Sequence, residues 1–211
     1  MGTPHRPRIL WSSSHYEFVL SDDYYFSTLA ALVAARADVV ESDHPLDLDW
    51  LKTFDCVVFN YPERPFTTKE VRKILRYLNG GGRVVITAYY ANEDGVAAVA
   101  SRLTAPLGIS FNFDRVETAD EGLMVTARTV REAEDAGISP NLTLRFPCSC
   151  SLAVSGAAFP VARAGDAIVC AAARHGAGAL VAIGTSVFWD NFSIGILDNE
   201  LFSLSVLGLR P

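Results

Sequence analysis

The chain has 211 residues, half of them hydrophobic, which excludes a disordered chain and is enough for one domain with a sizeable core. Lys and Arg number 18 against 24 Asp and Glu, giving a net charge of −6. No basic cluster stands out in the sequence, so we expect no nucleic-acid partner. No apolar run reaches the roughly 18 residues of a membrane-spanning helix. We expect no secretory signal, a cytoplasmic location and reduced cysteines.

The first half of the chain alternates between strand and helix patterns. Apolar runs predict strands at 8–11, 38–40, 55–60 and 83–87. Apolar residues at helical spacing predict helices at 22–36 and 94–103, with a turn of helix within 46–54. Alternation of this kind favours a mainly parallel sheet with helices on both faces, which is an α/β fold.

A helix between the third and fourth strands has the clearest local signal. Thr67-Thr68-Lys69-Glu70 fits a capping box, with Thr67 as N-cap and Glu70 at the third helical position. Apolar residues at 71, 74, 75 and 78 follow at helical spacing. Gly80-Gly81-Gly82 should end the helix through left-handed backbone geometry.

The second half changes character after about Pro106, because helical periods give way to short alternating segments. We interpret the segments 109–113, 123–126, 142–146, 151–154 and 167–171 as an antiparallel or mixed extension at one edge of the sheet. We also predict a short helix at 129–136, a buried strand at 178–184 and a closing helix at 198–209. Without a repeat or linker, residues 1–211 are expected to form a single domain.

Polar loops follow the strands at 8–11, 55–60, 83–87 and 178–184. In a parallel sheet these loops share one edge, where open α/β sheets bind ligands. The candidate site residues in these loops are Ser12, Ser13, Ser14, His15, Glu17, Asn60, Glu63, Tyr89, Asn92, Ser186, Asp190 and Asn191. They predict a pocket for a small polar ligand, in which a carboxylate and His15 could act as acid and base. Alternatively, the serines cap the next segment, and Asp190 and Asn191 form turns.

Metal and cysteine chemistry have weaker signals. His15 and Glu17, completed by Glu63 or Asp190, could bind a metal, but four histidines form no dense cluster and we expect no metal and no cofactor. Cys148 and Cys150 would point to the same face if they lie in a strand. Structural packing is the favoured interpretation, and a reactive thiol stays open. Aromatic residues beside the loops, among them Tyr61, Tyr89 and Trp189, either stack on a sugar or base or close the core.

Four blocks, taken in order, resemble a known family. They are residues 9–18 (ILWSSSHYEF), 60–70 (NYPERPFTTKE), 108–116 (GISFNFDRV) and 184–191 (GTSVFWDN) with Asp198-Asn199. The chain resembles the GIFT domains of intraflagellar transport protein 52 and of GldG-type bacterial gliding and transport accessory proteins. This group belongs to the class I glutamine amidotransferase-like superfamily. The resemblance covers roughly residues 8–209 and implies a flavodoxin-like, Rossmann-like sheet and usually no catalysis.

Amidotransferases of this superfamily have a nucleophilic cysteine on a strand-to-helix elbow and a later histidine–acid pair. Here Ala88-Tyr89-Tyr90 follows the strand at 83–87, and His175 has no acid partner at the expected spacing. We therefore expect no glutaminase activity and a non-catalytic binding or scaffold domain for a small polar ligand or a protein partner. The alternative is a hydrolase or lyase acting on a sugar- or nucleotide-like substrate at the loop edge. The second-half strands could also form a homo-oligomer or partner interface.

Overall fold

The computed structural model describes residues 5–118 and 120–210 and is a mixed α/β structure. Its large sheet has nine strands in the order β2-β1-β3-β4-β11-β10-β9-β6-β7. The parallel strands are β2 (Asp38–Ser42), β1 (Arg8–Ser12), β3 (Cys56–Phe59), β4 (Arg83–Thr87) and β11 (Gly178–Ile183). The antiparallel strands are β10 (Ala167–His175), β9 (Phe159–Ala164), β6 (Met124–Thr129) and β7 (Thr143–Pro147).

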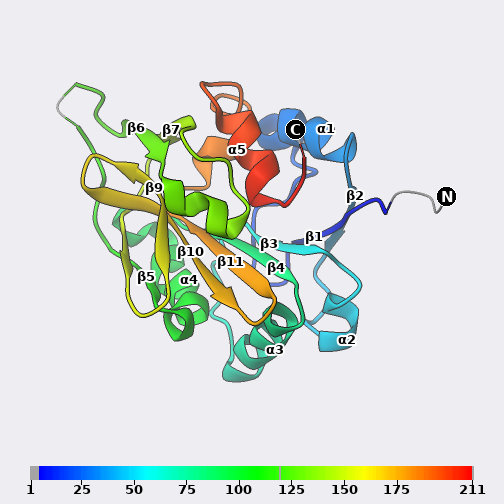
Figure 1. The fold of residues 1–211 in the computed structure, drawn as a ribbon. Helices are drawn as coiled ribbons and strands as arrows, with labels where there is room; N and C mark the ends of the chain where they lie inside the picture. Colours follow the sequence, from blue (N-terminus) through cyan, green and yellow to red (C-terminus); the bar gives the residue numbers. More distant parts are fainter. Residues whose placement is uncertain (1–4, 119, 211) are drawn as a thin grey trace.

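Helices cover both faces of the parallel strands (Figure 1). On one face lie α1 (Asp23–Ala34) and α5 (Asn199–Val206), and on the other lie α2 (Leu48–Leu51), α3 (Thr68–Asn79) and α4 (Val96–Thr104). Each face has its own hydrophobic core, because neighbouring residues of a strand point to opposite faces and both are apolar. In β1, for example, Ile9 and Trp11 pack on the α1 face and Leu10 on the α3 face.

The parallel register brings the carboxyl ends of four strands to one edge of the sheet. Leu10 in β1 lies beside Val57 in β3, which lies beside Val84 in β4, which lies beside Leu180 in β11. The loops after these strands therefore start side by side. This is the edge at which the sequence predicts a ligand site.

The capping box before α3 is confirmed. The Thr67 hydroxyl accepts a hydrogen bond from the Glu70 backbone N–H, and the Glu70 carboxylate accepts one from the Thr67 backbone N–H at 2.8 Å. At the other end of α3, Gly81 has a left-handed φ of +103°, whereas Gly80 does not. Gly82 lies against the ring of Tyr77, where a Cβ atom would clash.

The second half differs in part from the predicted strands. β5 (Ile109–Phe111) and β8 (Leu152–Val154) pair with each other as a separate two-stranded sheet, not as part of the large sheet. Their apolar residues join the core on the α3 and α4 face, so the pair covers that face instead of extending the edge. Strand β9 is missing from the sequence prediction, because Pro160 and Arg163 interrupt its apolar pattern.

Short 3-10 helices connect several elements. The helix expected at 129–136 is a 3-10 helix, η3 (Arg131–Ala136), because β6 continues to Thr129. The others are η1 (Tyr90–Gly95), η2 (Ala105–Leu107) and η4 (Val187–Trp189). Within η1, Ala91, Asn92 and Asp94 have positive φ, so this segment is a series of tight turns.

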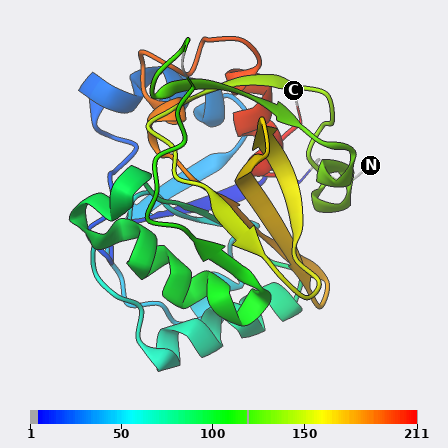
Figure 2. The same cartoon turned by 90° about the vertical axis from the view of Figure 1, so that its left-hand side faces the viewer.

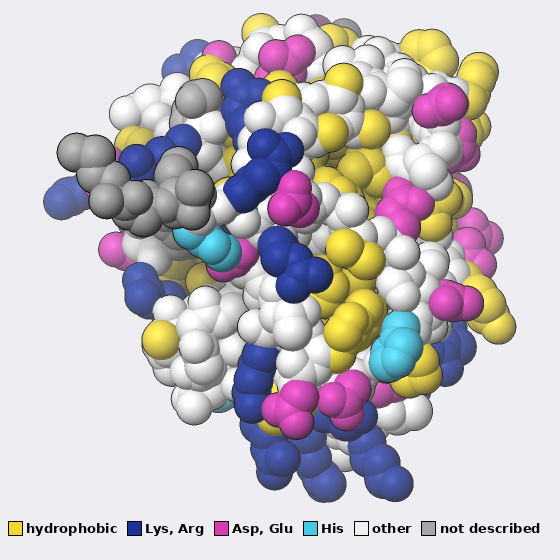
Figure 3. Space-filling view, turned by 90° about the vertical axis from the view of Figure 1, so that its right-hand side faces the viewer, with side chains coloured by type: hydrophobic (Ala, Val, Ile, Leu, Met, Phe, Trp, Pro, Cys, Tyr) yellow, Lys and Arg dark blue, Asp and Glu magenta, His cyan; other side chains and the backbone are white. Residues whose placement is uncertain are grey.

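The surface shows charge that the linear sequence does not reveal. Lys69, Arg72 and Arg76 are exposed on α3 at spacings of three and four, which places them on one side of the helix. Figure 3 shows Lys and Arg side chains gathered at the bottom of the molecule, the region of α3 in Figure 1. Figure 2 shows α3 and α4 together below the sheet. Among the described residues, no helix is long and apolar enough to cross a lipid bilayer.

Candidate functional site

A pocket of about 380 Å³ opens at the carboxyl edge of the parallel strands. Its walls come from the loops after β1, β3, β4 and β11 and from the first turn of α1. The lining residues are Phe18, Tyr25, Phe26, Tyr61, Tyr89, Glu93, Ser186, Val187 and Asp190. Most of the wall is therefore aromatic. Glu93 and Asp190 add two carboxylates, and Ser186 adds a hydroxyl to those of the three tyrosines.

The aromatic wall is held by backbone contacts between neighbouring loops. The Phe18 N–H donates to the Asn60 carbonyl at 2.9 Å, and the Phe18 ring stacks on Tyr61 with centroids 4.6 Å apart. Tyr61 has a left-handed φ of 64°, and its N–H donates to Thr87 Oγ1 at 2.9 Å. The strained backbone at Tyr61 thus turns the ring out of β3 and over the sheet edge.

Carboxylates shape the polar side of the pocket. The Tyr61 hydroxyl donates to Asp94 Oδ2 at 2.9 Å, and burial together with this carboxylate raises the pKa of Tyr61. Burial likewise raises the pKa of Asp190, although hydrogen bonds from Ser193 and from the Phe192 backbone N–H oppose the shift. The charged residues of the pocket are therefore acidic, and none of its lining residues is basic.

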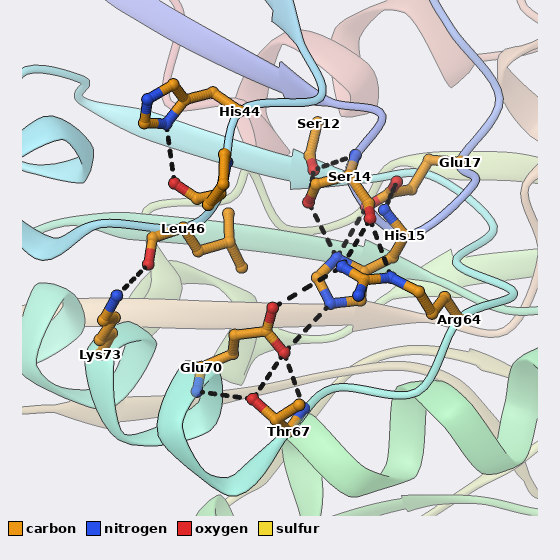
Figure 4. A network of polar contacts seen from close by, with 11 residues as sticks. Ser12, Ser14, His15, Glu17, His44, Leu46, Arg64, Thr67, Glu70 and Lys73 are labelled. Carbon is orange, nitrogen blue, oxygen red and sulfur yellow. Dashed lines mark hydrogen bonds and ion pairs between the residues drawn. The ribbon is translucent and has the colours of Figure 1, made fainter.

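A second polar cluster lies in the loop after β1 (Figure 4), and its His15 and Glu17 side chains are buried. The His15 side chain is fully buried and stacks on Phe66 with ring centroids 4.1 Å apart. Its Nδ1 atom lies 2.9 Å from Ser14 Oγ and 3.8 Å from Glu17 Oε1, and its Nε2 atom lies 3.6 Å from Glu70 Oε2. The capping box of α3 therefore brings Glu70 to the histidine.

The pKa values of the cluster's titratable groups are shifted from their ordinary values. Burial lowers the pKa of His15 to about 4, against the raising effect of Glu70, so the imidazole is neutral at pH 7. Burial raises the pKa of Glu17, whose Oε2 accepts the His15 backbone N–H at 2.6 Å. Burial would raise the pKa of Glu70 too, but hydrogen bonds from Thr67 outweigh it and the pKa is lowered. Among the described residues, His15 Nε2 and Glu17 Oε1 have no hydrogen-bond partner.

The candidate residues from the sequence therefore fall into separate groups. Tyr89, Ser186 and Asp190 line the pocket. Ser12, Ser14, His15 and Glu17 belong to the buried cluster, where Ser12 Oγ lies 2.9 Å from Ser14 Oγ.

The other candidates make structural contacts. The backbone N–H groups of Ser13 and Glu63 donate to the carbonyls of Ser42 and His15, both at 2.9 Å. Asn60 Oδ1 accepts from Thr87 Oγ1, and Asn92 Oδ1 accepts from the Ala98 N–H in α4.

Asn191 and Trp189 also lie outside the pocket lining. Asn191 Nδ2 donates to the carbonyls of Asp23 and Tyr24, which ties the loop after β11 to α1. Trp189 is fully buried against Trp11, with ring centroids 5.2 Å apart, so this aromatic residue closes the core.

Sequence reasoning missed several residues of the pocket. Tyr61 was noted only as an aromatic residue beside the loops. The other lining residues outside the candidate list are Phe18, Tyr25, Phe26, Glu93 and Val187. Phe26 follows the helical spacing of a core residue, and only the fold shows that its ring also reaches the pocket. The signal available was that one or two aromatic residues follow each of β1, β3 and β4 within six positions.

Cys148 and Cys150 do not share a strand face, which corrects the expectation. β7 ends at Pro147, and Cys148 has a left-handed φ of 53° that breaks the alternation. Cys150 is buried, and burial raises its pKa to about 12, so its thiol is protonated at neutral pH. Within residues 5–118 and 120–210, no group of three or more His, Cys, Asp or Glu side chains is placed to hold a metal ion.

Comparison with solved structures shows the fold. The mmIFT52 N-terminal domain has a TM-score of 0.77 at 19% identity and covers 93% of this chain and 94% of that chain. A cytoplasmic protein of Salmonella typhimurium has a TM-score of 0.63 at 15% identity, covering 96% of this chain and 98% of that chain. The expected GIFT-like fold is therefore confirmed.

Comparison with curated sequences shows the family. No protein-family model matches the chain. An uncharacterized protein of Aquifex aeolicus is 32% identical over 224 aligned positions, which cover 97% of this chain and 94% of that protein. Because this similarity extends over nearly the whole of both sequences, the chain belongs to the same family as the Aquifex aeolicus protein.

Proposed function

We propose that this chain is a non-catalytic binding domain whose ligand, a small molecule or a side chain of a protein partner, enters the aromatic pocket. The observation that carries the proposal is the position of that pocket at the carboxyl ends of β1, β3, β4 and β11, where α/β sheets bind ligands. Its volume of about 380 Å³ suits a small group. The likeness to the mmIFT52 N-terminal domain also favours a protein partner.

The placement of the acid–base residues favours binding over catalysis. A general base must come within hydrogen-bond reach of its substrate. The side chains of His15 and Glu17 are fully buried, and neither residue lines the pocket. The carboxylates that do line it, Glu93 and Asp190, have no histidine or cysteine beside them in the lining.

The finer family features belong to the same proposal. The order β2-β1-β3-β4-β11 supports a flavodoxin-like arrangement, and we propose a degenerate site of the glutamine amidotransferase type. Ala88 and Tyr89 stand directly after β4, where those enzymes have a nucleophilic cysteine. His175 lies at the hairpin between β10 and β11, at the opposite end of β11 from the pocket. We also propose a cytoplasmic location and a single domain.

A fragment screen tests the binding function. Isotope-labelled protein is mixed with small sugars, nucleosides, amines and carboxylic acids, and backbone amide shifts are recorded. We expect the shifted amides to cluster at Phe18, Tyr61, Tyr89 and Asp190. The variant Val187→Phe, which fills the pocket wall, should abolish them. Leu197→Phe, at an exposed position outside the pocket, should not.

Two results would contradict the proposal. The first is a set of amide shifts remote from the pocket or unaffected by Val187→Phe. The second is chemical turnover of a sugar- or nucleotide-like fragment that depends on Glu93 or Asp190, which would support the hydrolase or lyase alternative instead.

A further inference from the structure

The pocket combines aromatic rings with negative charge. Phe18, Tyr25, Phe26, Tyr61 and Tyr89 supply rings, and the charged residues of the lining are Glu93 and Asp190. A pocket for an anionic ligand favours Arg or Lys, and the lining has neither. Rings and carboxylates without a basic residue are the composition that favours a cation.

The rings meet at different angles around the cavity. Phe18 and Tyr61 are stacked at 22°, whereas Tyr61 and Tyr89 meet at 64° with centroids 5.6 Å apart. Tyr25 and Phe26 meet at 45° with centroids 6.1 Å apart. Such rings offer several π faces and edges to one bound group, and a cation within about 6 Å of a ring face is attracted by its quadrupole.

The carboxylates at the pocket accept hydrogen bonds but have no basic partner among the described residues. Among the ion pairs of the described residues, none involves Glu93, Asp94 or Asp190. Asp94 accepts the hydroxyl hydrogen of Tyr61, which makes that phenol ring more electron-rich. Asp190 is only 9% exposed. Its carboxylate is therefore partly desolvated, and a cation in the pocket would be attracted to it more strongly than to a carboxylate in water.

We propose that the pocket binds an organic cation of the alkylammonium class, with the rings enclosing its methyl or methylene groups and Glu93 and Asp190 neutralising its charge. The inference rests on the proposed binding function and names the chemistry of its ligand. Alkylammonium groups occur on free small molecules and on methylated lysine side chains. The pocket would bind either of them through the same contacts.

The test compares a cation with its uncharged isostere. Choline and 3,3-dimethylbutan-1-ol have the same shape, but the second has carbon in place of the charged nitrogen. We expect choline to bind the wild-type chain about 2- to 30-fold more tightly, as measured by amide shifts and calorimetry. The preference should be larger at low salt because part of it is electrostatic.

Matched variants separate the contribution of the carboxylates to choline binding from that of the aromatic rings. Glu93→Gln and Asp190→Asn should weaken choline binding several-fold and leave the alcohol unchanged. Glu132→Gln, an exposed carboxylate outside the lining, should change neither. Tyr25→Leu should weaken choline binding, whereas Tyr16→Leu should not, because Tyr16 is exposed and outside the lining. All these variants are judged only after their unfolding transitions match the wild type.

The outcomes distinguish this inference from the function on which it rests. Equal affinity for choline and the alcohol would overturn the cation site and leave the binding function intact. No binding of choline would also overturn it, and if no fragment of the screen bound either, both proposals would fail.

A third ligand, N-acetyl-trimethyllysine methylamide, identifies the source of the alkylammonium group. Tighter binding than choline supports a partner's side chain, and weaker binding supports a free small molecule.

Discussion

His15 is a buried histidine whose ionisation is linked to folding. Its pKa is about 4 in the folded chain against 6.5 for a free side chain. As the pH falls below 6.5 the unfolded state takes up a proton first, so the free energy of unfolding decreases. The loss stops growing below about pH 4, where the folded state is protonated too, and amounts to up to about 3 kcal/mol.

Comparison with His15→Gln isolates this effect. Urea unfolding is measured from pH 7 to pH 4 for both proteins, and the wild type should lose stability relative to the variant across that window. The raised pKa of Glu17 acts in the opposite direction, because the folded state then binds its proton more tightly, but Glu17 is present in both proteins. Parallel stability curves would show that the histidine is not held neutral by burial.

Gly184 illustrates a residue whose lack of a side chain is required by close packing. A Cβ atom at Gly184 would clash with the carbonyl oxygen of Cys150, whose own N–H donates to the Gly184 carbonyl at 2.9 Å. We expect Gly184→Ala to lower the free energy of unfolding by about 1–3 kcal/mol. Gly195→Ala is the control, because nothing lies within 4 Å of the added atom. Similar denaturation midpoints for the two variants would contradict the close approach.

At the scale of elements, the capping box of α3 offers a defined test. Thr67→Ala removes the hydroxyl that accepts the Glu70 N–H, and we expect a loss of about 0.5–2 kcal/mol in the free energy of unfolding. Thr68→Ala, at the exposed first position of the helix, should change it by less than about 0.5 kcal/mol. Equal chemical-denaturation curves for the two variants would rule out the cap as a stabilising contact.

Elements with strong local signals were predictable, and those without were not. The strand Arg83–Thr87 and the Thr67 cap were located from sequence, because each is specified by its own residues. β9 was missed and β5 was assigned to the wrong sheet, because strand pairing depends on residues far apart in the chain. Cys148 and Cys150 were considered as a pair on one strand face, but β7 ends at Pro147 and Cys148 has a positive φ.

At the scale of the whole molecule, the two cores on opposite faces of the sheet can be tested together. Leu29 in α1 and Leu103 in α4 are both fully buried, one on each face. Each Leu→Ala change should reduce the free energy of unfolding by about 2–5 kcal/mol. Because they share no cavity, the double variant should lose the sum within about 0.5 kcal/mol.

The same variants test the single-domain prediction. One cooperative calorimetric transition, moved to lower temperature by either change, is the expected result. Two transitions, each sensitive to one variant only, would mean that the faces unfold independently. The possible homo-oligomer also stays a prediction, and light scattering during size-exclusion chromatography gives the mass that decides it.

The sequence by itself determined the α/β class, the parallel strands of the first half and the sheet edge at which their polar loops meet. These follow from hydrophobic period and from caps, which act over a few neighbouring residues. Only the tertiary structure decided that His15 and Glu17 are buried while Phe18, Tyr61 and Asp190 meet in one pocket. The reason is physical: burial and proximity depend on how separate loops fold over the same sheet edge, and no local pattern encodes the distances between them.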